Sequence, residues 1–504
     1  MKNSIALPAV LSTLFSPEPE TTSVDRAFPA TGNPEIDQLA ADFLARPISP
    51  SSFYELECAI EAVQMKATRE ILARIANAAA AQVDALGDRA FHDGEEFRRL
   101  NAPTPNAHVA SRFGTFTLNR QMFRCTRRDA GEPCISPAEI ALGLSGGATP
   151  ALAESATRYL AEAGSTQESV LQRLNEEHDV AMGPERLRKM TEERAARLSE
   201  TETDRNVKRV LELLEKAHAS KGKHKPGLSV GRDGVTIREY LNRGFEVAGV
   251  GTLAVFDRRG QRLGTVYIGC VPESLQLTLS QRLTKVITGV LQRWDKALPH
   301  LSYVTDSGDN ETAYDENVLR PMVHPRTGEA LTWRRVVDFY HVMERVWAMA
   351  KALFGKDERG RAAWARRMGK LLKKPNGAFR VLHSAAALAA RLGLPKARQA
   401  DFNKAYAYIR ARTPWMKYRE YKAVGIPLGS GITEAACKTL VAQRLKLSGM
   451  RWKKGGSLQA ILDLRATLIS GTWKAANETL LKGITLPKMR THPKQSHQPA
   501  KIAA

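Results

Sequence analysis

The sequence is poor in cysteine and has no cysteine pair of the kind that binds zinc or builds a disulfide framework. Its 504 residues include five scattered cysteines, and none of them forms a Cys-x-x-Cys motif. This spacing argues against a disulfide-stabilised fold. Cys125 and Cys134 flank a polar loop and could supply half of a zinc site, but the sequence offers no second pair nearby, which favours free thiols.

Long apolar runs are also missing. No stretch approaches the roughly 20 apolar residues that a membrane-spanning helix needs. The segment 1–8 is too short and too interrupted by proline for a secretory signal. We therefore expect a cytoplasmic protein without a membrane partner.

Acidic residues are few relative to basic ones. The chain has 75 Lys and Arg against 53 Asp and Glu, a formal net charge of +22 and a pI near 9.9. A basic surface gains affinity for nucleic acid by releasing condensed counterions, so a polyanionic partner is expected. Ribosomal and membrane-surface proteins can be equally basic. The 43% hydrophobic content is ample for buried cores, and the length allows several domains.

The first half of the chain is predicted to be mostly helical. Residues 1–50 are rich in Pro, Ser, Thr and Ala with little periodicity, which indicates a flexible arm and a short helix after Asn33. Residues 51–220 are assigned to a helical DNA-binding region, with a small hairpin between 109 and 125. Its helices are expected at 53–86, 136–144, 149–162, 166–177, 184–198 and 205–219.

Residues 165–198 have the helix, short turn and proline-started second helix of a helix-turn-helix. Short turns between helices are also common in any bundle. The sequence therefore leaves two interpretations of this segment open: a module that reads DNA, or two ordinary helices that pack in a bundle.

From residue 227 the pattern becomes that of an α/β domain. Strands are predicted at 228–237, 250–256, 264–268, 301–305 and 333–339, with helices at 274–297 and from about Tyr314. The order βββαβαβ predicts a mixed five-stranded sheet. Helices expected at 342–353, 360–372, 379–392 and 396–412 form an insertion over 341–425. The α/β domain thus comprises 227–340 and 426–473, followed by a basic tail, 474–504.

Three carboxylates stand where such a sheet can bring them together. Asp233 interrupts an apolar strand, and Asp306 directly follows the fourth strand. If the first and fourth strands are parallel neighbours, these two acids meet at the edge where ligands bind. Glu434 opens a helix that can deliver a third carboxylate for two divalent ions. Asp309 is an alternative to Asp306, whereas Asp257 is typical of a turn.

Basic residues follow Glu434 along and beyond its helix, and a phosphate could be held by any of them: Lys438, Arg444, Lys446, Arg451, Lys453 and Lys454. The alternative is ordinary surface charge, since a Glu–Lys pair at i,i+4 is common and contributes only about 0.2–0.5 kcal/mol. Trp347, Trp364 and Trp415 of the insertion could stack on an unpaired base, although tryptophans at helical spacing are more often core.

Together these motifs resemble the DDE transposases of insertion sequences. The segments IPLGSGITEAACKTLV (426–441) and LSGMRW (447–452) are similar to the C-terminal motif of ISKra-type transposases. Asp338 and His341 fit the DxxH mark that Mutator-like transposases carry after the second acid, for which a structural strand-end pair is the alternative. The likeness covers roughly residues 228–473.

The resemblance implies an RNase H-like catalytic domain in which Asp233, Asp306 and Glu434 hold two Mg²⁺ or Mn²⁺ ions. Asp338 and His341 would support the site or position the DNA end. It implies cleavage at the terminal inverted repeats, strand transfer into target DNA, a homo-oligomer on DNA in the nucleoid, and no small-molecule cofactor. The alternatives are a non-catalytic DNA-binding regulator or decayed transposase, and a nuclease of the same fold that cuts without joining.

Overall fold

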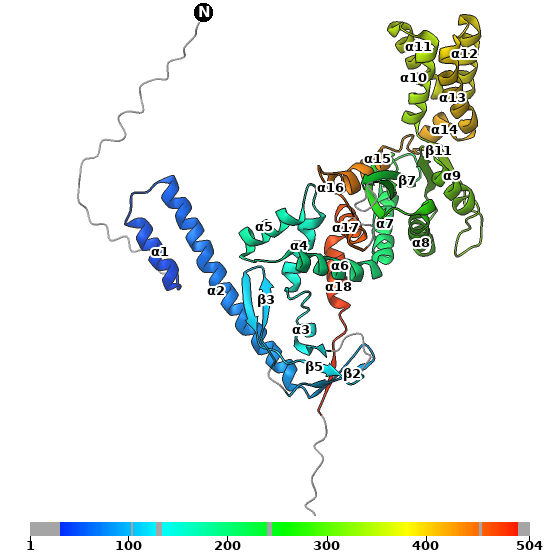
Figure 1. Ribbon diagram of the computed structural model, residues 1–504. Helices are drawn as coiled ribbons and strands as arrows, with labels where there is room; N and C mark the ends of the chain where they lie inside the picture. The colour runs from blue at the N-terminus through cyan, green and yellow to red at the C-terminus, as the bar shows by residue number, and fades with distance from the viewer. Residues whose placement is uncertain (1–30, 102–103, 128–133, 239–243, 453–455, 492–504) are drawn as a thin grey trace, which may run out of the picture. The chain divides into compact units, whose positions relative to one another are not determined.

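The computed structural model describes residues 31–101, 104–127, 134–238, 244–452 and 456–491, and it divides into two compact units, 1–71 and 72–504 (Figure 1). In the first unit, α1 (Pro34–Leu44) begins after Asn33, whose side chain caps the helix. Helix α2 (Pro50–Ala85) begins in this unit and contains the boundary at Ile71. Both helices lie where the sequence predicts them.

Short strands occupy much of the stretch between the helices predicted at 53–86 and 136–144. One sheet has the order β12-β1-β2-β5-β6, and β3 pairs with β4 as the predicted hairpin. The strands are β1 (Arg89–His92), β2 (Glu95–Arg99), β3 (Ala107–Ser111), β4 (Gly114–Leu118), β5 (Phe123–Cys125), β6 (Cys134–Ile135) and β12 (Lys488–Arg490). Strands of two to five residues contain too little alternation to be recognised in the sequence.

Part of the predicted basic tail is folded. Helix α18 (Trp473–Lys482) buries Trp473 and Ala476, and β12 pairs with β1. The prediction of a tail from residue 474 is therefore wrong up to residue 491, because apolar contacts at the start of α18 outweigh its polar composition. Residues 492–504 lie outside the described part of the chain.

Five helices link this region to the main sheet, and the sequence predicts each of them: α3 (Pro137–Ala141), α4 (Pro150–Ala161), α5 (Gln167–His178), α6 (Pro184–Glu200) and α7 (Glu202–Ala219). Ser136, Thr149 and Thr166 cap α3, α4 and α5 by accepting a hydrogen bond from the amide three residues on. Helices α5 and α6 occupy the segment predicted as a helix-turn-helix.

The main sheet is mixed and five-stranded, as predicted, with the order β11-β10-β7-β8-β9. Its strands are β7 (Gly227–Arg238), β8 (Phe245–Phe256), β9 (Arg262–Cys270), β10 (His300–Thr305) and β11 (Trp333–Val337). Strands β7, β8 and β9 are antiparallel, and β10 runs parallel to both β7 and β11. The first and fourth strands of the domain are thus parallel neighbours.

The elements between these strands are η1 (Ser274–Gln276), α8 (Leu277–Arg293), α9 (Asp309–Tyr314) and the π-helix η2 (Asp315–Leu319). Helix α9 begins earlier than the predicted start near Tyr314. Strand β11 ends before the predicted limit of 339 because Asp338 caps the next helix.

Helices cover both faces of this sheet. Helices α7 and α8 share a core with one face, to which β7, β8 and β9 contribute Val230, Leu253 and Val266. The other face is covered by α15 (Gly431–Ala436), the π-helix η4 (Cys437–Ala442), α16 (Gln443–Leu445) and α17 (Gly456–Ile469). The sheet therefore lies between two helical layers.

The helix predicted to begin at Glu434 contains the π segment η4. Glu434 and Lys438 are exposed, whereas Val441 and Leu445 are buried. At 3.6 residues per turn these four residues would lie on one face of the helix, but the wider π turn rotates the helix between them.

The predicted insertion is a group of four helices that pack on one another (Figure 1). They are α10 (Phe339–Phe354), α11 (Glu358–Leu372), α12 (Gly377–Leu392) and α13 (Lys396–Arg412), followed by η3 (Thr413–Trp415) and α14 (Tyr418–Ala423). Their core includes Val346, Trp364 and Ile409. The insertion leaves the sheet after β11 and returns to it at α15.

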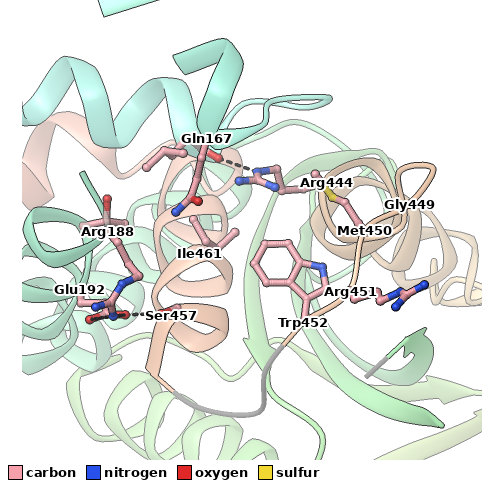
Figure 2. Close-up of a pocket in the computed structure, with 12 residues that line it drawn as sticks. Gln167, Arg188, Glu192, Arg444, Gly449, Met450, Arg451, Trp452, Ser457 and Ile461 are labelled. Atoms are coloured by element: carbon pink, nitrogen blue, oxygen red, sulfur yellow. Dashed lines mark hydrogen bonds and ion pairs between the residues drawn. The ribbon is translucent and has the colours of Figure 1, made fainter. Parts of the chain in front are cut away.

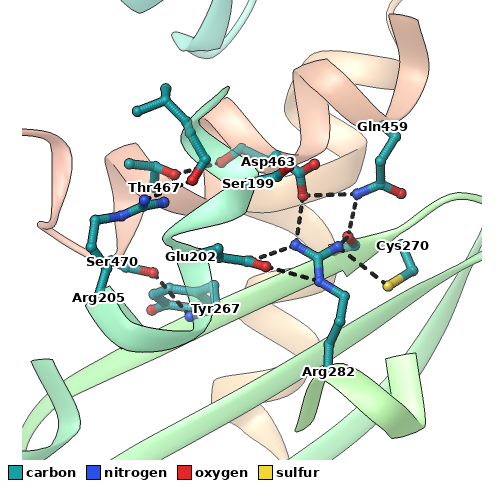
Figure 3. Close-up of polar contacts among 12 residues, drawn as sticks. Ser199, Glu202, Arg205, Tyr267, Cys270, Arg282, Gln459, Asp463, Thr467 and Ser470 are labelled. Atoms are coloured by element: carbon teal, nitrogen blue, oxygen red, sulfur yellow. Dashed lines mark hydrogen bonds and ion pairs between the residues drawn. The ribbon is translucent and has the colours of Figure 1, made fainter. Parts of the chain in front are cut away.

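A buried ion network joins elements that are far apart in the sequence (Figure 3). Arg282 of α8 donates to Glu202 of α7 at 3.1 Å and to Asp463 of α17 at 2.6 Å. It also donates to the carbonyl of Gly269 in β9 at 2.9 Å. One guanidinium thus ties both helical layers to the sheet.

All five cysteines are free thiols, as the sequence predicts. Among the described residues, no helix combines the length and the apolar composition that crossing a bilayer requires.

Candidate active site

The register of the main sheet places Asp233 and Asp306 beside each other. The last pair between β10 and β7 is Tyr303 with Val230. Three residues further along each chain stand Asp306 and Asp233. Because the two strands are parallel, both acids lie at the same edge of the sheet. Asp309, the alternative to Asp306, is an exposed residue at the start of α9.

Glu434 reaches this edge because α15 lies directly on the sheet. A β-carbon at Gly231 would collide with the hydroxyl of Thr433 and lie 2.8 Å from that of Thr252. The two threonine hydroxyls are themselves hydrogen-bonded at 2.9 Å. Glycine at position 231 therefore permits the close approach that brings Glu434 toward Asp233.

The acids influence one another electrostatically. Burial raises the pKa of Asp233, and the negative charges of Asp306 and Glu434 raise it further. A fourth acid, Glu311 of α9, is also affected by these charges. Its burial, and to a smaller extent the negative charges of Asp306 and Asp233, raise its pKa to about 6. Carboxylates that raise the pKa of a neighbour repel one another, and a cation between them would reduce that repulsion.

The donor set fits a divalent cation in its chemistry. Carboxylate oxygens are the ligands that Mg²⁺ and Mn²⁺ prefer. In the described part of the chain, however, no three His, Cys, Asp or Glu side chains are arranged closely enough to hold a metal ion. Two of the acids accept hydrogen bonds from nearby backbone amides. Asp233 accepts one from the amide of Gly234 at 2.7 Å, and Asp306 accepts one from the amide of Gly308 at 3.2 Å.

Asp338 links the strand edge to the Glu434 helix. One of its carboxylate oxygens caps α10 by accepting from the amide of His341 at 2.9 Å. The other accepts from the hydroxyl of Ser430 at 2.7 Å, and the same hydroxyl lies 2.9 Å from Glu434. Asp338 is fully buried. It orders the residues around the site and is not itself exposed to a substrate.

His341 faces Glu434 directly, with 3.4 Å between its Nε2 and the nearer carboxylate oxygen. Its Nδ1 lies 3.2 Å from Glu344. Burial alone would lower the pKa of His341, but the hydrogen bond to Glu344 and the charges of Asp338, Glu344 and Glu434 together raise it. The ring of His341 thus lies between the carboxylates of Glu344 and Glu434. The Asp338–His341 pair thus supports the third acid.

Cys437 was not singled out in the sequence, yet its thiol donates to Asp233 at 3.3 Å. Burial, together with the charge of Asp233, raises the pKa of this thiol, so it remains protonated. Glu311, Ser430 and Cys437 are all contributed by segments adjacent to the predicted acids. Only proximity to Asp306 or Glu434 in the sequence could have indicated them.

The basic residues after Glu434 that the structure describes fall into two groups. Lys438, Lys446 and Arg451 are exposed and free to meet a polyanion. Arg444 is only 2% exposed and donates to the carbonyl of Leu160 at 2.8 Å. The expectation that Arg444 holds a phosphate therefore does not fit its position.

Arg444 has a packing role instead. It lines a pocket of about 360 Å³ beside Trp452, and its guanidinium lies 5.5 Å from the indole ring (Figure 2). Lys453 and Lys454, also expected to bind phosphate, lie outside the described residues.

The insertion carries most of the excess positive charge. Residues 341–425 contain 20 Lys and Arg against five Asp and Glu, a net charge of +15 out of +22 for the chain. Sixteen of these bases are exposed. Of the three tryptophans considered for base stacking, Trp364 belongs to the core, whereas Trp415 lies under the guanidinium of Arg335 at 4.0 Å. Trp347 is 38% exposed.

The second helix of the predicted helix-turn-helix shows little positive charge. Helix α6 buries Leu187, Met190 and Leu198. Its most exposed charged residues are Glu185, Lys189, Arg197 and Glu200. This balanced face gives no net attraction to phosphate, so it favours the packing interpretation of α6.

The fold and the site define a class: a mixed α/β protein with carboxylates gathered where parallel strands end, and with a basic helical insertion before the third acid. The chain matches no protein-family model, and it matches no curated protein sequence.

Proposed function

We propose that the protein is a DDE-type transposase with an RNase H-like catalytic domain, which cleaves the ends of a mobile element and joins them to target DNA. The observation that carries the proposal is the meeting of Asp233 and Asp306 on adjacent parallel strands with Glu434 on the helix packed over them. The sequence motifs around Asp338 and Glu434 support the same class.

In this proposal Asp233, Asp306 and Glu434 hold two Mg²⁺ or Mn²⁺ ions. Bound ions of this kind activate the attacking hydroxyl group and neutralise charge that develops at phosphorus. Ser430 and His341 hold Glu434 in place, and Cys437 orients Asp233. Lys438 stands one turn beyond Glu434 and contacts a phosphate of the bound strand.

The basic insertion supplies the main attraction for DNA. Its net charge of +15 suits a long, sequence-independent contact with the phosphate backbone. Two element ends must be brought together for joining, so the active form on DNA is a homo-oligomer acting at the nucleoid. The proposal requires no small-molecule cofactor.

The test is cleavage and strand transfer in vitro with Mg²⁺ or Mn²⁺, on DNA that carries the terminal sequences flanking the gene. We expect Asp233→Asn, Asp306→Asn and Glu434→Gln each to lose activity by about 10³-fold or more while DNA binding is retained, because carboxylate ligands are removed. Asp309→Asn is the matched control and should stay active. Full activity in any of the first three variants would exclude the assignment.

The same assay separates two other functions. Cutting without joining would identify a nuclease of this fold, and salt-dependent binding without metal-dependent cutting would identify a DNA-binding regulator or a decayed transposase. Joined products in the wild type are the result that the proposal requires.

A further inference from the structure

Helix α13 of the insertion holds the backbone of the loop that carries Asp306. The hydroxyl of Tyr408 donates to the carbonyl of Asp306 at 2.7 Å. One turn further along the helix, Arg412 donates to the carbonyl of Ser307 at 3.0 Å. Two successive carbonyls beside the second acid are therefore bonded to an element about 100 residues further along the chain.

Tyr408 and Arg412 are themselves fixed. The guanidinium of Arg412 lies 3.9 Å from the ring centroid of Tyr408, and that of Arg345 from α10 lies 4.9 Å from the same ring. Burial raises the pKa of the Tyr408 hydroxyl, so it remains a proton donor. The pair presents two donors whose directions are set by packing.

The loop that carries Asp306 has an unfavourable backbone conformation, which these two hydrogen bonds help to stabilise. Ser307 has φ of 63°, a left-handed conformation that residues other than glycine adopt only at a cost. It is buried, and its hydroxyl has no hydrogen-bond partner among the described residues. The turn nevertheless sets the direction of the Asp306 carboxylate, because one oxygen accepts from the amide of Gly308.

We propose that Tyr408 and Arg412 are positioning residues for Asp306, through which the insertion sets the geometry of the acid site. The inference rests on the proposed function for its chemistry, but the bonds that carry it do not depend on that function. Lys404 and Arg410 are exposed on the same helix. DNA bound to these two residues therefore contacts α13, the same helix that holds the loop of Asp306.

The experiment uses the full chain and compares Tyr408→Phe and Arg412→Gln with the wild type. We expect kcat for cleavage to fall by about 10- to 100-fold, because misplacement of a reacting group is costly, while KM and DNA affinity change less than about twofold. Arg412→Lys keeps a donor and should recover much of kcat. Tyr406→Phe is the control for loss of a hydroxyl, since Tyr406 stacks on Phe402 of the same helix.

Arg410→Gln shows the opposite pattern if the inference holds: weaker DNA binding and a higher KM, with kcat retained. Unchanged kcat in Tyr408→Phe and Arg412→Gln would overturn it, as would a loss confined to KM, which would mean that these residues only contact DNA.

A second arm keeps the inference testable if the wild type cuts no DNA, a result that would sink the proposed function alone. Affinity for Mn²⁺, measured by titration calorimetry, should fall at least about fivefold in Tyr408→Phe and stay constant in Tyr406→Phe, because a displaced Asp306 is a poorer ligand. Equal Mn²⁺ affinity in both variants would overturn the positioning role.

Discussion

Glu311 is a carboxyl group buried beside two other acids, and the charge it carries at neutral pH is unfavourable. Its pKa is raised from 4.5 to about 6, first by burial and then by Asp306 and Asp233. The folded protein therefore holds this proton more tightly than the unfolded chain. The stabilising contribution is complete below about pH 4.5 and is lost as the pH rises through 6.

We expect Glu311→Gln to be more stable than the wild type at pH 8 by about 2 kcal/mol, at about 1.4 kcal/mol per pH unit, and equally stable near pH 4. Urea unfolding at both pH values, with EDTA present to remove cations, measures the difference. A constant difference between the two proteins across this range would show that Glu311 is not protonated more readily in the folded state.

Gly231 is the residue on which the approach of α15 depends. In Gly231→Ala the new methyl group meets the hydroxyls of Thr433 and Thr252. We expect a loss of about 1–3 kcal/mol in the free energy of unfolding, as for other overpacked sites, together with loss of cleavage as Glu434 is displaced.

The matched control is Gly431→Ala, since a β-carbon there meets nothing within 4 Å. Gly431 is the first residue of α15, the helix that also contains Thr433, and Gly431→Ala should be as stable as the wild type or slightly more stable. Equal urea midpoints for the two alanine variants would contradict the close approach at Gly231.

At the scale of elements, helix α11 tests the role of the insertion. Arg366, Arg367 and Lys370 are exposed on one stretch of this helix. Replacing all three with Gln should reduce the slope of log Kd against log salt by about 2 to 3, because each phosphate contact contributes about 0.9. Fluorescence anisotropy with labelled duplex over a salt series measures the slope.

A control with the same change in charge uses exposed lysines outside the insertion, Lys474, Lys482 and Lys488. Their triple Gln variant should alter the slope by less than one unit. If both triple variants changed the slope equally, net charge and not the insertion would govern binding.

The elements also show what the sequence can predict. Helix α13 has the predicted bounds because Pro395 precedes it and Pro414 follows it closely. Strands β7 and β10 were recognisable as apolar runs, and their parallel pairing brought Asp233 and Asp306 together as expected. These features depend on local composition and on one simple topological rule.

Other features depend on contacts between distant residues and could not be foreseen. Strand β12 exists through its pairing with β1, and Arg444 is buried because it meets the end of α4. The hydrogen bond from Tyr408 to the carbonyl of Asp306 joins segments 102 residues apart. No local pattern in the sequence records such a contact.

At the scale of the whole molecule, Arg282 joins three helices and a strand between residues 202 and 463. Its partners Glu202 and Asp463 are each nearly buried, with side chains 13% exposed. Removing the cation leaves two buried carboxylates without compensation. We expect Arg282→Ala to lower the free energy of unfolding by about 3–5 kcal/mol.

The control for this prediction is Lys208→Ala, which breaks a solvent-exposed pair with Asp204 on α7 and should cost less than about 1 kcal/mol. A triple variant with Arg282→Met, Glu202→Gln and Asp463→Asn should regain part of the loss, because no charge is then left buried alone. Urea unfolding followed by tryptophan fluorescence distinguishes the three proteins. If Arg282→Ala were no less stable than Lys208→Ala, the two helical layers would be held to the sheet by apolar packing alone.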